Sequence, residues 1–453
     1  SANGIYSEKW KTRFSPEEIV SHEFYEDYPD EVIVTWKKMV NGSYQTIESI
    51  LGRPTSTHYF CKAVVENFTY CSIQFVKTYK PFQTIKVKSI KMGTVFNWQN
   101  DDISKGSVME EVDTTGATLP INTSSISIID SDGDFDVMNA NGIWKYLKND
   151  QEFVISELVD DKEVAVGNFF LKNWNYQENE TTFELQDRLG LMDSINFMGG
   201  MYANKNAEQL LAEIFATANV TDYFIADTLK NVTLTGYLPI CSCREALHQV
   251  AFSINAVVDA SRGSTIRVYP PDRNVDSYIM VSRKFSGGTT AELDDYVSGI
   301  SISCTTYTEK TTSSEIFKGD LERGVHKIEF TAPYTSLSAT NATIIESGIN
   351  YAYLNVPNNA YVTLNGLGYD TSEFTVSKKT ATIEEGQKSN IKAFSGITIY
   401  NTTLLQSIAE RLLKWFSLRQ KVSIEYLCDS EKVGEWVGIQ DANNNSRYAI
   451  TCI

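Results

Sequence analysis

Hydrophobic and polar residues alternate along much of this chain, and the pattern is clearest in the stretch Ser104–Met138. Within Ile121–Ile129, Ile126 and Ile128 alternate with serines, which is the period-two pattern of a half-buried strand. A shorter run, Ser107–Val112, precedes the polar break DTTGATLP, and the turn residues DSDGD follow the second run. We predict two strands and two sharp turns here, and we expect the rest of the chain to be organised around them.

Strand-like runs also occur on both sides of this stretch, with Gly, Asn or Pro close to many of them. One pair indicates a hairpin, with a strand through Gly167–Leu171, a turn at Glu178–Glu180 and a return through Thr182–Leu185. The other runs are Glu31–Trp36, Tyr70–Val76, Ile85–Met92, Thr94–Trp98, Gly142–Tyr146, Glu152–Leu158, Val164–Trp174, Gly299–Cys304, Val325–Ala332, Ala352–Val356, Tyr361–Leu364, Val422–Leu427 and Tyr448–Cys452.

Helical spacing of apolar residues appears at three places. Asn206 is predicted to cap a helix whose apolar face holds Leu210, Leu211, Ile214 and Phe215. A second helix opens at Cys243–Leu247 and is predicted to stop at Ser261–Gly263, with apolar positions at Leu247, Val250, Ala251, Ile254 and Val258. A third, amphipathic helix covers 404–418, with Leu405, Ile408, Ala409, Leu412 and Phe416 on one side.

Four phrases of the sequence stand out, in this order along the chain. They are Glu110–Asp113 with Leu119–Asn122 and Asp130–Phe135; then 164–193; then 244–269; then 409–436, with a shorter match at Ile345–Tyr351. In these phrases the chain resembles the tail-tip (baseplate) hub proteins of phages and prophages of Gram-positive bacteria, often labelled minor structural or tail-associated proteins. The resemblance extends over roughly 85–453, about four-fifths of the chain.

The resemblance implies a mainly β fold with α+β parts. It consists of two tube-like β-barrel domains plus a mixed helix/strand segment, as in phage baseplate hub proteins. We expect an N-terminal segment of unknown role at 1–80, a first hub barrel at 81–195, a mixed domain at 196–298, and a second hub barrel at 299–453 that includes the helix 404–418. A chain of 453 residues is long enough for two to four domains.

Composition and charge narrow the possible functions. A net charge of −17 argues against general nucleic-acid binding, which needs clustered Lys and Arg. An acidic channel can still let DNA slide without sticking, although acidity also serves solubility alone. Seven scattered cysteines do not indicate a disulfide framework. No run approaches the roughly 20 apolar residues that cross a bilayer.

The sequence offers no convincing chemical site, and we predict no catalytic, cofactor-binding or metal-binding residues. The loop at Asp130–Asp136 has alternate carboxylates, but Phe135 and Asn141 stand where a calcium loop needs Gly and Glu. The four histidines are far apart in the sequence. Glu110 and Glu111 are expected on opposite faces of a strand, which disfavours joint acid–base work.

We therefore expect a structural hub and not an enzyme. The resemblance implies a homotrimeric ring, made in the bacterial cytoplasm, that continues the tail tube of a virion. Its partners would be tail tube, distal tail and tape-measure proteins and possible fibre or receptor-binding proteins, with DNA passing the lumen. Glu110, Glu111 and Asp113 are candidate lumen or interface charges. A tail-associated wall hydrolase and a carbohydrate-binding protein that recognises the host are the alternatives.

Overall fold

The computed structural model describes residues 17–24, 28–40, 42–54, 58–65, 68–78, 85, 87–93, 96, 98–140, 142–159, 162–271, 274–380, 388–428, 431–441 and 448–453. The chain folds into two compact units. Unit 1 holds 1–105, 127–148 and 175–182, and unit 2 holds 106–126, 149–174 and 183–453. The fold is mainly β with few helices, which confirms the predicted fold class. The predicted division into four domains stays a prediction.

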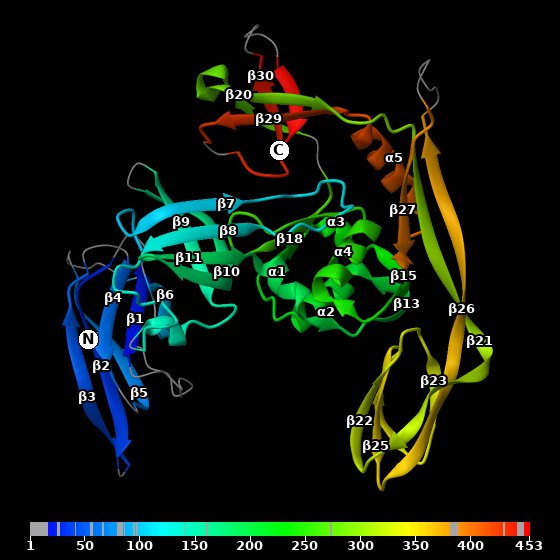
Figure 1. Ribbon diagram of the computed structural model, residues 1–453, viewed down its shortest axis with the longest axis horizontal. Helices are drawn as coiled ribbons and strands as arrows, with labels where there is room; N and C mark the ends of the chain where they lie inside the picture. Colours follow the sequence, from blue (N-terminus) through cyan, green and yellow to red (C-terminus); the bar gives the residue numbers. More distant parts are fainter. Residues whose placement is uncertain are drawn as a thin grey trace. The chain divides into compact units, whose positions relative to one another are not determined.

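Two three-stranded sheets form the N-terminal part of unit 1 (Figure 1). Their orders are β4-β1-β6 and β3-β2-β5. The core between them includes Val32, Val34, Trp36, Cys61 and Ile73. The strands are β1 (Glu17–Phe24), β2 (Pro29–Val40), β3 (Ser43–Gly52), β4 (His58–Val64), β5 (Tyr70–Thr78) and β6 (Val87–Gly93), so the runs expected at 31–36 and 70–76 are confirmed as strands.

The organising stretch contributes to a five-stranded sheet of order β7-β8-β11-β10-β9. Its members are β7 (Ile103–Met109), β8 (Thr123–Ile129), β9 (Glu152–Val159), β10 (Lys162–Gln177) and β11 (Glu180–Gln186). The first strand was predicted at Ser107–Val112 but ends at Met109, because the following residues form a loop that contacts other parts of unit 2. The run at Gly142–Tyr146 is a 3-10 helix, η1 (Ile143–Tyr146), and not a strand. Part of the run Thr94–Trp98 lies outside the described residues.

Two buried carboxylates, Asp130 and Asp187, hold the chain just after β8 and just after β11. Asp130 accepts hydrogen bonds from the backbone N–H groups of Asp134 and Phe135 and from the Thr181 hydroxyl at 2.8–3.0 Å. Its carboxylate therefore closes the DSDGD turn. In unit 2, Asp187 caps α1 (Arg188–Asp193) by accepting from the Gly190 N–H.

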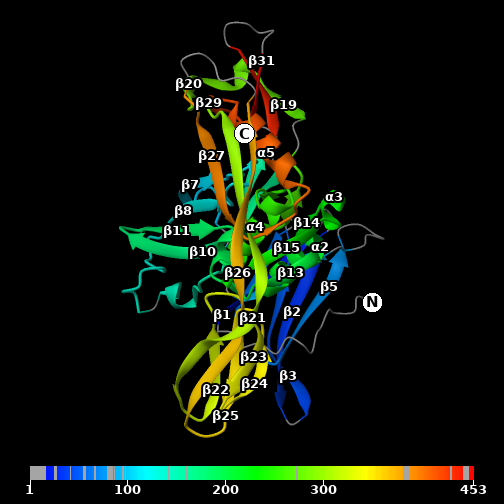
Figure 2. The ribbon, with the colours of Figure 1, turned by 90° about the vertical axis from the view of Figure 1, so that its right-hand side faces the viewer.

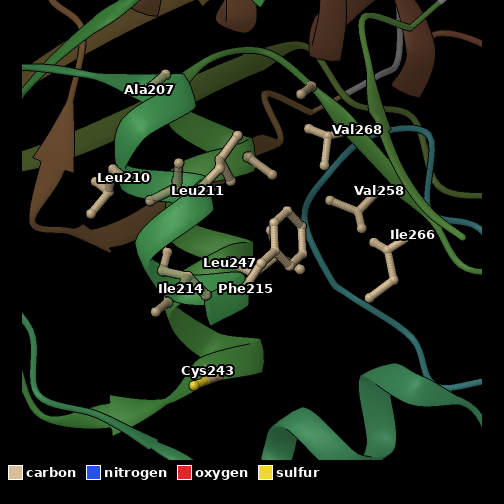
Figure 3. Packing of buried hydrophobic residues seen from close by; sticks show 14 of the residues in the cluster. Ala207, Leu210, Leu211, Ile214, Phe215, Cys243, Leu247, Val258, Ile266 and Val268 are labelled. Carbon is tan, nitrogen blue, oxygen red and sulfur yellow. The ribbon is translucent and has the colours of Figure 1, made fainter. Parts of the chain in front are cut away.

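The mixed segment of unit 2 surrounds the largest apolar core, part of which Figure 3 shows. The helix α2 (Ala207–Thr217) is capped by the Asn206 side chain and buries the predicted apolar face. The helix α4 (Cys243–Ser253) ends well before the predicted stop, because Asn255 takes a positive φ of 58° and the chain turns into a strand. The other elements are β12 (Asn196–Phe197), β13 (Gly200–Asn206), β14 (Tyr223–Ile225), α3 (Asp227–Lys230), β15 (Thr233–Leu238), β16 (Cys241–Ser242), β17 (Val257–Asp259), β18 (Ile266–Tyr269) and β19 (Val275–Ile279).

A long antiparallel ribbon, β21 (Gly299–Leu321) with β26 (Ala360–Lys379), runs from α5 (Leu405–Phe416) to a small tip (Figures 1 and 2). The tip has its own core, which includes Phe330, Leu354 and Val362. Its strands are β22 (Gly324–Glu329), β23 (Thr335–Thr340), β24 (Thr343–Ser347) and β25 (Tyr351–Val356). The sequence predicted only the first six residues of β21, because its middle stretch, residues 308–315, is exposed and polar.

The predicted amphipathic helix is confirmed as α5, which buries Leu405, Ile408, Ala409 and Leu412. After it the chain returns through a two-stranded sheet and a three-stranded sheet of order β19-β30-β31. The remaining elements are η2 (Val281–Arg283), β20 (Lys284–Leu293), β27 (Ile391–Ile397), β28 (Ile399–Tyr400), β29 (Gln420–Tyr426), β30 (Trp436–Gln440) and β31 (Tyr448–Cys452).

The β10–β11 turn tests how the hairpin is specified. Glu178 and Asn179 have φ values of 48° and 70°, as a two-residue type I′ turn requires. We expect Asn179→Ala to cost about 1 kcal/mol, because an alanine resists the left-handed region. Hydrogen exchange of the β10 and β11 amides beside the turn should then lose protection. Asn179→Gly is the control and should retain it; equal loss in both variants would contradict this explanation.

Candidate functional site

A partly buried loop without regular structure, Glu110–Asn122, joins β7 to β8; we call it the 110–122 loop. Asp113 organises it by accepting hydrogen bonds from the N–H and hydroxyl groups of Thr115 and Thr118 at 2.6–2.8 Å. Gly116 allows the turn with a φ of +70°. Thr114 and Thr115 are buried, so their backbone carbonyl groups need donors from elsewhere in the protein.

Arg411 of α5 supplies those donors. Its two terminal nitrogens donate to the carbonyl oxygens of Thr114 and Thr115, each at 2.8 Å, and its Nε donates to Asn255 Oδ1 at 2.7 Å. Burial lowers the pKa of Arg411 to about 10, and the nearby Asp113 carboxylate opposes this shift. The guanidinium is therefore still charged at neutral pH, and it joins the loop to α5 and to the end of α4.

Two side chains of α4 also contact the 110–122 loop. Arg244 Nη1 donates to the Leu119 carbonyl at 2.6 Å, while its Nε donates to Asp193 Oδ1 at 2.9 Å. His248 Nε2 lies 3.1 Å from the Gly116 carbonyl oxygen, to which it donates in the tautomer that carries the proton on Nε2. One face of α4 thus holds the loop at two points.

Glu110 contacts the segment that follows β17. Its Oε1 accepts from the Arg262 N–H at 3.0 Å, and its Oε2 lies 3.0 Å from Arg262 Nε. The Glu110 side chain is only 9% exposed. Of the three acidic residues singled out from the sequence, Glu110 and Asp113 are thus engaged inside unit 2, and Glu111 is exposed, with its N–H bonded to Asn122. Both glutamates lie beyond the end of β7, so the expected strand geometry does not apply to them.

The C-terminal end of the loop is fixed by Asp187. Asn122 and Asp187 exchange two bonds: the Asn122 N–H donates to Asp187 Oδ2 at 3.0 Å, and the Asp187 N–H donates to the Asn122 carbonyl at 2.9 Å. Burial raises the pKa of Asp187 to about 6, although the N–H groups of Asn122, Gly190 and Leu189 pull it down. The Asn122 side chain in turn accepts from the Glu111 N–H.

All four phrases of the sequence resemblance meet at this loop. The first phrase supplies the two ends of the loop, Glu110–Asp113 and Leu119–Asn122, the second Asp187, the third Arg244, His248 and Arg262, and the fourth Arg411, which contacts the loop between those ends. The shorter phrase acts elsewhere in unit 2: the buried Asn350 accepts from the Tyr237 hydroxyl and donates to the carbonyls of Met198 and Leu238. Every one of these groups is used in holding the fold.

The contacts made by Arg411 and Arg244 were not predicted from the sequence. One signal was available: Arg411 lies at the edge of the apolar face of an amphipathic helix, where a partly buried charge needs a partner. Its partners, however, lie 156 to 297 residues away.

Three further features of the described residues concern metal binding, thiols and membrane-spanning helices. No group of three or more His, Cys, Asp or Glu side chains there could hold a metal ion. All seven cysteines are free thiols. No helix among the described residues has both the length and the apolar character to cross a membrane.

No protein-family model and no curated protein matches the chain. Among solved structures, it is similar to a tail protein from Neisseria meningitidis MC58, with 11% identity over 77% of this chain and 84% of that chain and a TM-score of 0.44. It is also similar to prophage tail protein gp18 from Listeria monocytogenes EGD-e (9% identity, 81% and 86% coverage, TM-score 0.41). A third is the 43 kDa tail protein of prophage MuSo2 from Shewanella oneidensis (8% identity, 79% and 89% coverage, TM-score 0.43). These organisms do not support the expected restriction to Gram-positive bacteria.

Removing the Arg411 guanidinium tests the loop contact. We expect Arg411→Ala to lower the free energy of unfolding by about 2–4 kcal/mol, because two buried carbonyl groups lose their donors. Lys414→Ala, at an exposed position of the same helix, is the control and should change stability by less than about 0.5 kcal/mol. Urea unfolding measures both, and similar losses in the two variants would count against the contact.

The raised pKa of Asp187 predicts a pH dependence. Its ordinary value is 3.8 and its folded value is about 6, so between these values the folded state binds the proton more tightly than the unfolded state. The contribution of Asp187 to the free energy of unfolding is therefore greatest at low pH and is lost as the pH rises through 6. The stability of wild type relative to Asp187→Asn should fall between pH 4 and pH 7 by on the order of 2–3 kcal/mol. A difference that stays constant or grows with pH would refute this.

Proposed function

We propose that this chain is a structural hub protein of a phage or prophage tail tip, whose copies form a ring that continues the tail tube. The observation that supports this most is that the four phrases of the resemblance, spread from Glu110 to Trp436, meet at the 110–122 loop. Phrases that matched by chance would have no reason to share one contact region. The shared contact region therefore supports the resemblance.

The loop suits a protein that bears mechanical load. It ties a strand of the five-stranded sheet to α4 and α5 through several hydrogen bonds that involve charged groups, which are stronger than neutral ones. In the proposed ring, three copies would keep their sheets at fixed positions around a passage. Tail tube, distal tail and tape-measure proteins would adjoin it, along with fibre or receptor-binding proteins. The net charge of −17 suits DNA passage without binding, and Glu111 is the candidate lumen charge.

We propose no catalytic step for this chain. The acidic and basic side chains that sequence inspection singled out, such as Glu110, Asp130 and His248, hold loops in place. The rival function is a tail-associated hydrolase of the cell wall. Release of soluble fragments from purified peptidoglycan by the isolated chain would favour that rival.

A second candidate function is carbohydrate binding by the N-terminal sheets of unit 1. Tyr44 and Tyr70 have ring centroids 4.9 Å apart, and the Lys37 ammonium lies 5.7 Å from the Tyr70 ring centre. Tyr44 is 46% exposed, so its ring is available to stack on a sugar. A glycan array comparing wild type with Tyr44→Ala would detect such binding.

The hub proposal predicts the chain's place in a particle. In tails purified from the bacterium that encodes it, we expect cryo-electron microscopy to show the chain as a threefold ring at the tail tip with an acidic lumen. Deleting its gene should abolish complete tails, and a plasmid copy should restore them, as should a Lys414→Ala copy. Complete tails that lack the chain, or a ring with a neutral or basic lumen, would overturn the proposal.

A further inference from the structure

The sheet formed by β20 and β29 is incomplete. It has two strands. Figure 1 shows β20 and β29 side by side, and Lys421, Val422, Ser423 and Glu425 of β29 are exposed. Within the described residues, the strand ladder pairs β29 with β20 alone, so its outer edge has no strand beside it. An isolated two-stranded sheet is marginally stable in water and gains from further strands.

The two edges of this sheet are not equivalent. In β20 the register shifts between Lys284 and Thr289, so residues 285–288 form a bulge, and bulges protect edges from pairing. In β29 the ladder is regular from Gln420 to Ile424. The outer edge of β29 is therefore the one suited to accept another strand.

The sequence of this edge is complementary to itself. When Lys421-Val422-Ser423-Ile424-Glu425 pairs antiparallel with an identical segment about Ser423, each Lys421 faces a Glu425 and each Val422 faces an Ile424. Side chains alternate between faces, so both charge pairs lie on one face and the apolar pairs lie on the other. Val422 is 39% exposed in the single chain, so this pairing would cover it.

The apolar face also continues into β20. Ala291 lies opposite Val422 and Leu293 opposite Gln420 in the ladder, and Leu293 is 65% exposed. Two copies would therefore form a four-stranded sheet of order β20-β29-β29-β20 with one apolar and one charged face. We propose that the outer edge of β29 pairs antiparallel with the same edge of a second copy of this chain, about a two-fold axis. This pairing does not depend on the proposed tail-hub role.

Charge reversal tests the register of this pairing. Glu425→Lys or Lys421→Glu alone would place like charges opposite each other twice across the axis, so the dimer dissociation constant should rise about tenfold or more. The double variant Lys421→Glu/Glu425→Lys should restore dimerisation. Inside each chain Lys421 lies opposite Glu292, so Lys421→Glu and the double variant both lose that favourable neighbour, and recovery of the double variant relative to Lys421→Glu cannot come from a repaired fold. Sedimentation equilibrium over a range of concentrations measures the constants, and thermal unfolding confirms that each variant is folded.

Cross-linking tests the two-fold axis. In a Cys428→Ser background, which removes the exposed native thiol, Ser423→Cys should form a disulfide-linked dimer on mild oxidation because the two Ser423 positions face each other. Thr290→Cys is the control. Thr290 lies opposite Ser423 on β20 of the same chain, away from the proposed interface, so this variant should stay monomeric. A wild type that remains monomeric at all concentrations, equal cross-linking of both variants, or a double charge variant without recovery would overturn the proposal. Cross-linking only between mixed Ser423→Cys and Thr290→Cys chains would show head-to-tail pairing instead, and would also refute it.

Discussion

The buried carbonyl groups of the 110–122 loop are the constraint on which the architecture of unit 2 depends. Buried backbone groups of a loop must find hydrogen-bond donors, and among the described residues no strand pairs with this loop to provide them. Arg411 and Arg244 donate to three of its carbonyl oxygens. Because the Arg411 guanidinium is itself largely withdrawn from water, it is tolerated only while its acceptors are in place. The loop and the helices therefore stabilise one another, and neither arrangement is favourable alone.

This mutual dependence explains which parts of the fold the sequence predicted. The helix that starts after Asn206 has both a capping side chain and a regular apolar face, so local information was sufficient. For α4 the apolar spacing continued to Val258, but Val258 is buried from a strand instead. The middle of β21, residues 308–315, has no apolar alternation, since it pairs with β26 while its side chains on both faces meet solvent. The strand forms because it pairs with β26, and the pattern of its own residues could not predict that pairing.

The contact region itself was only partly predictable. The phrases that resemble tail hubs contain its residues, but the resemblance gave no reason for any one of them. Asp187 before a short helix is a recognisable capping residue, whereas its second role at Asn122 is a contact across 65 residues. The acidic pair Glu110 and Glu111 suggested surface charge, yet Glu110 is largely withdrawn from solvent by Arg262. Charge in a sequence does not reveal whether its partner is water or another side chain.

Satisfied interior groups and open sheet edges together suggest how such a chain divides its tasks. In the interior of unit 2, many polar groups bond to one another. Unused hydrogen-bonding capacity is found at strand edges, where β20 is protected by a bulge and β29 is not. An edge that is regular and self-complementary in charge would be a hazard for a protein that works alone, because it invites association. For a protein that works as several copies, the same edge is an asset, since it remains available for pairing with another copy.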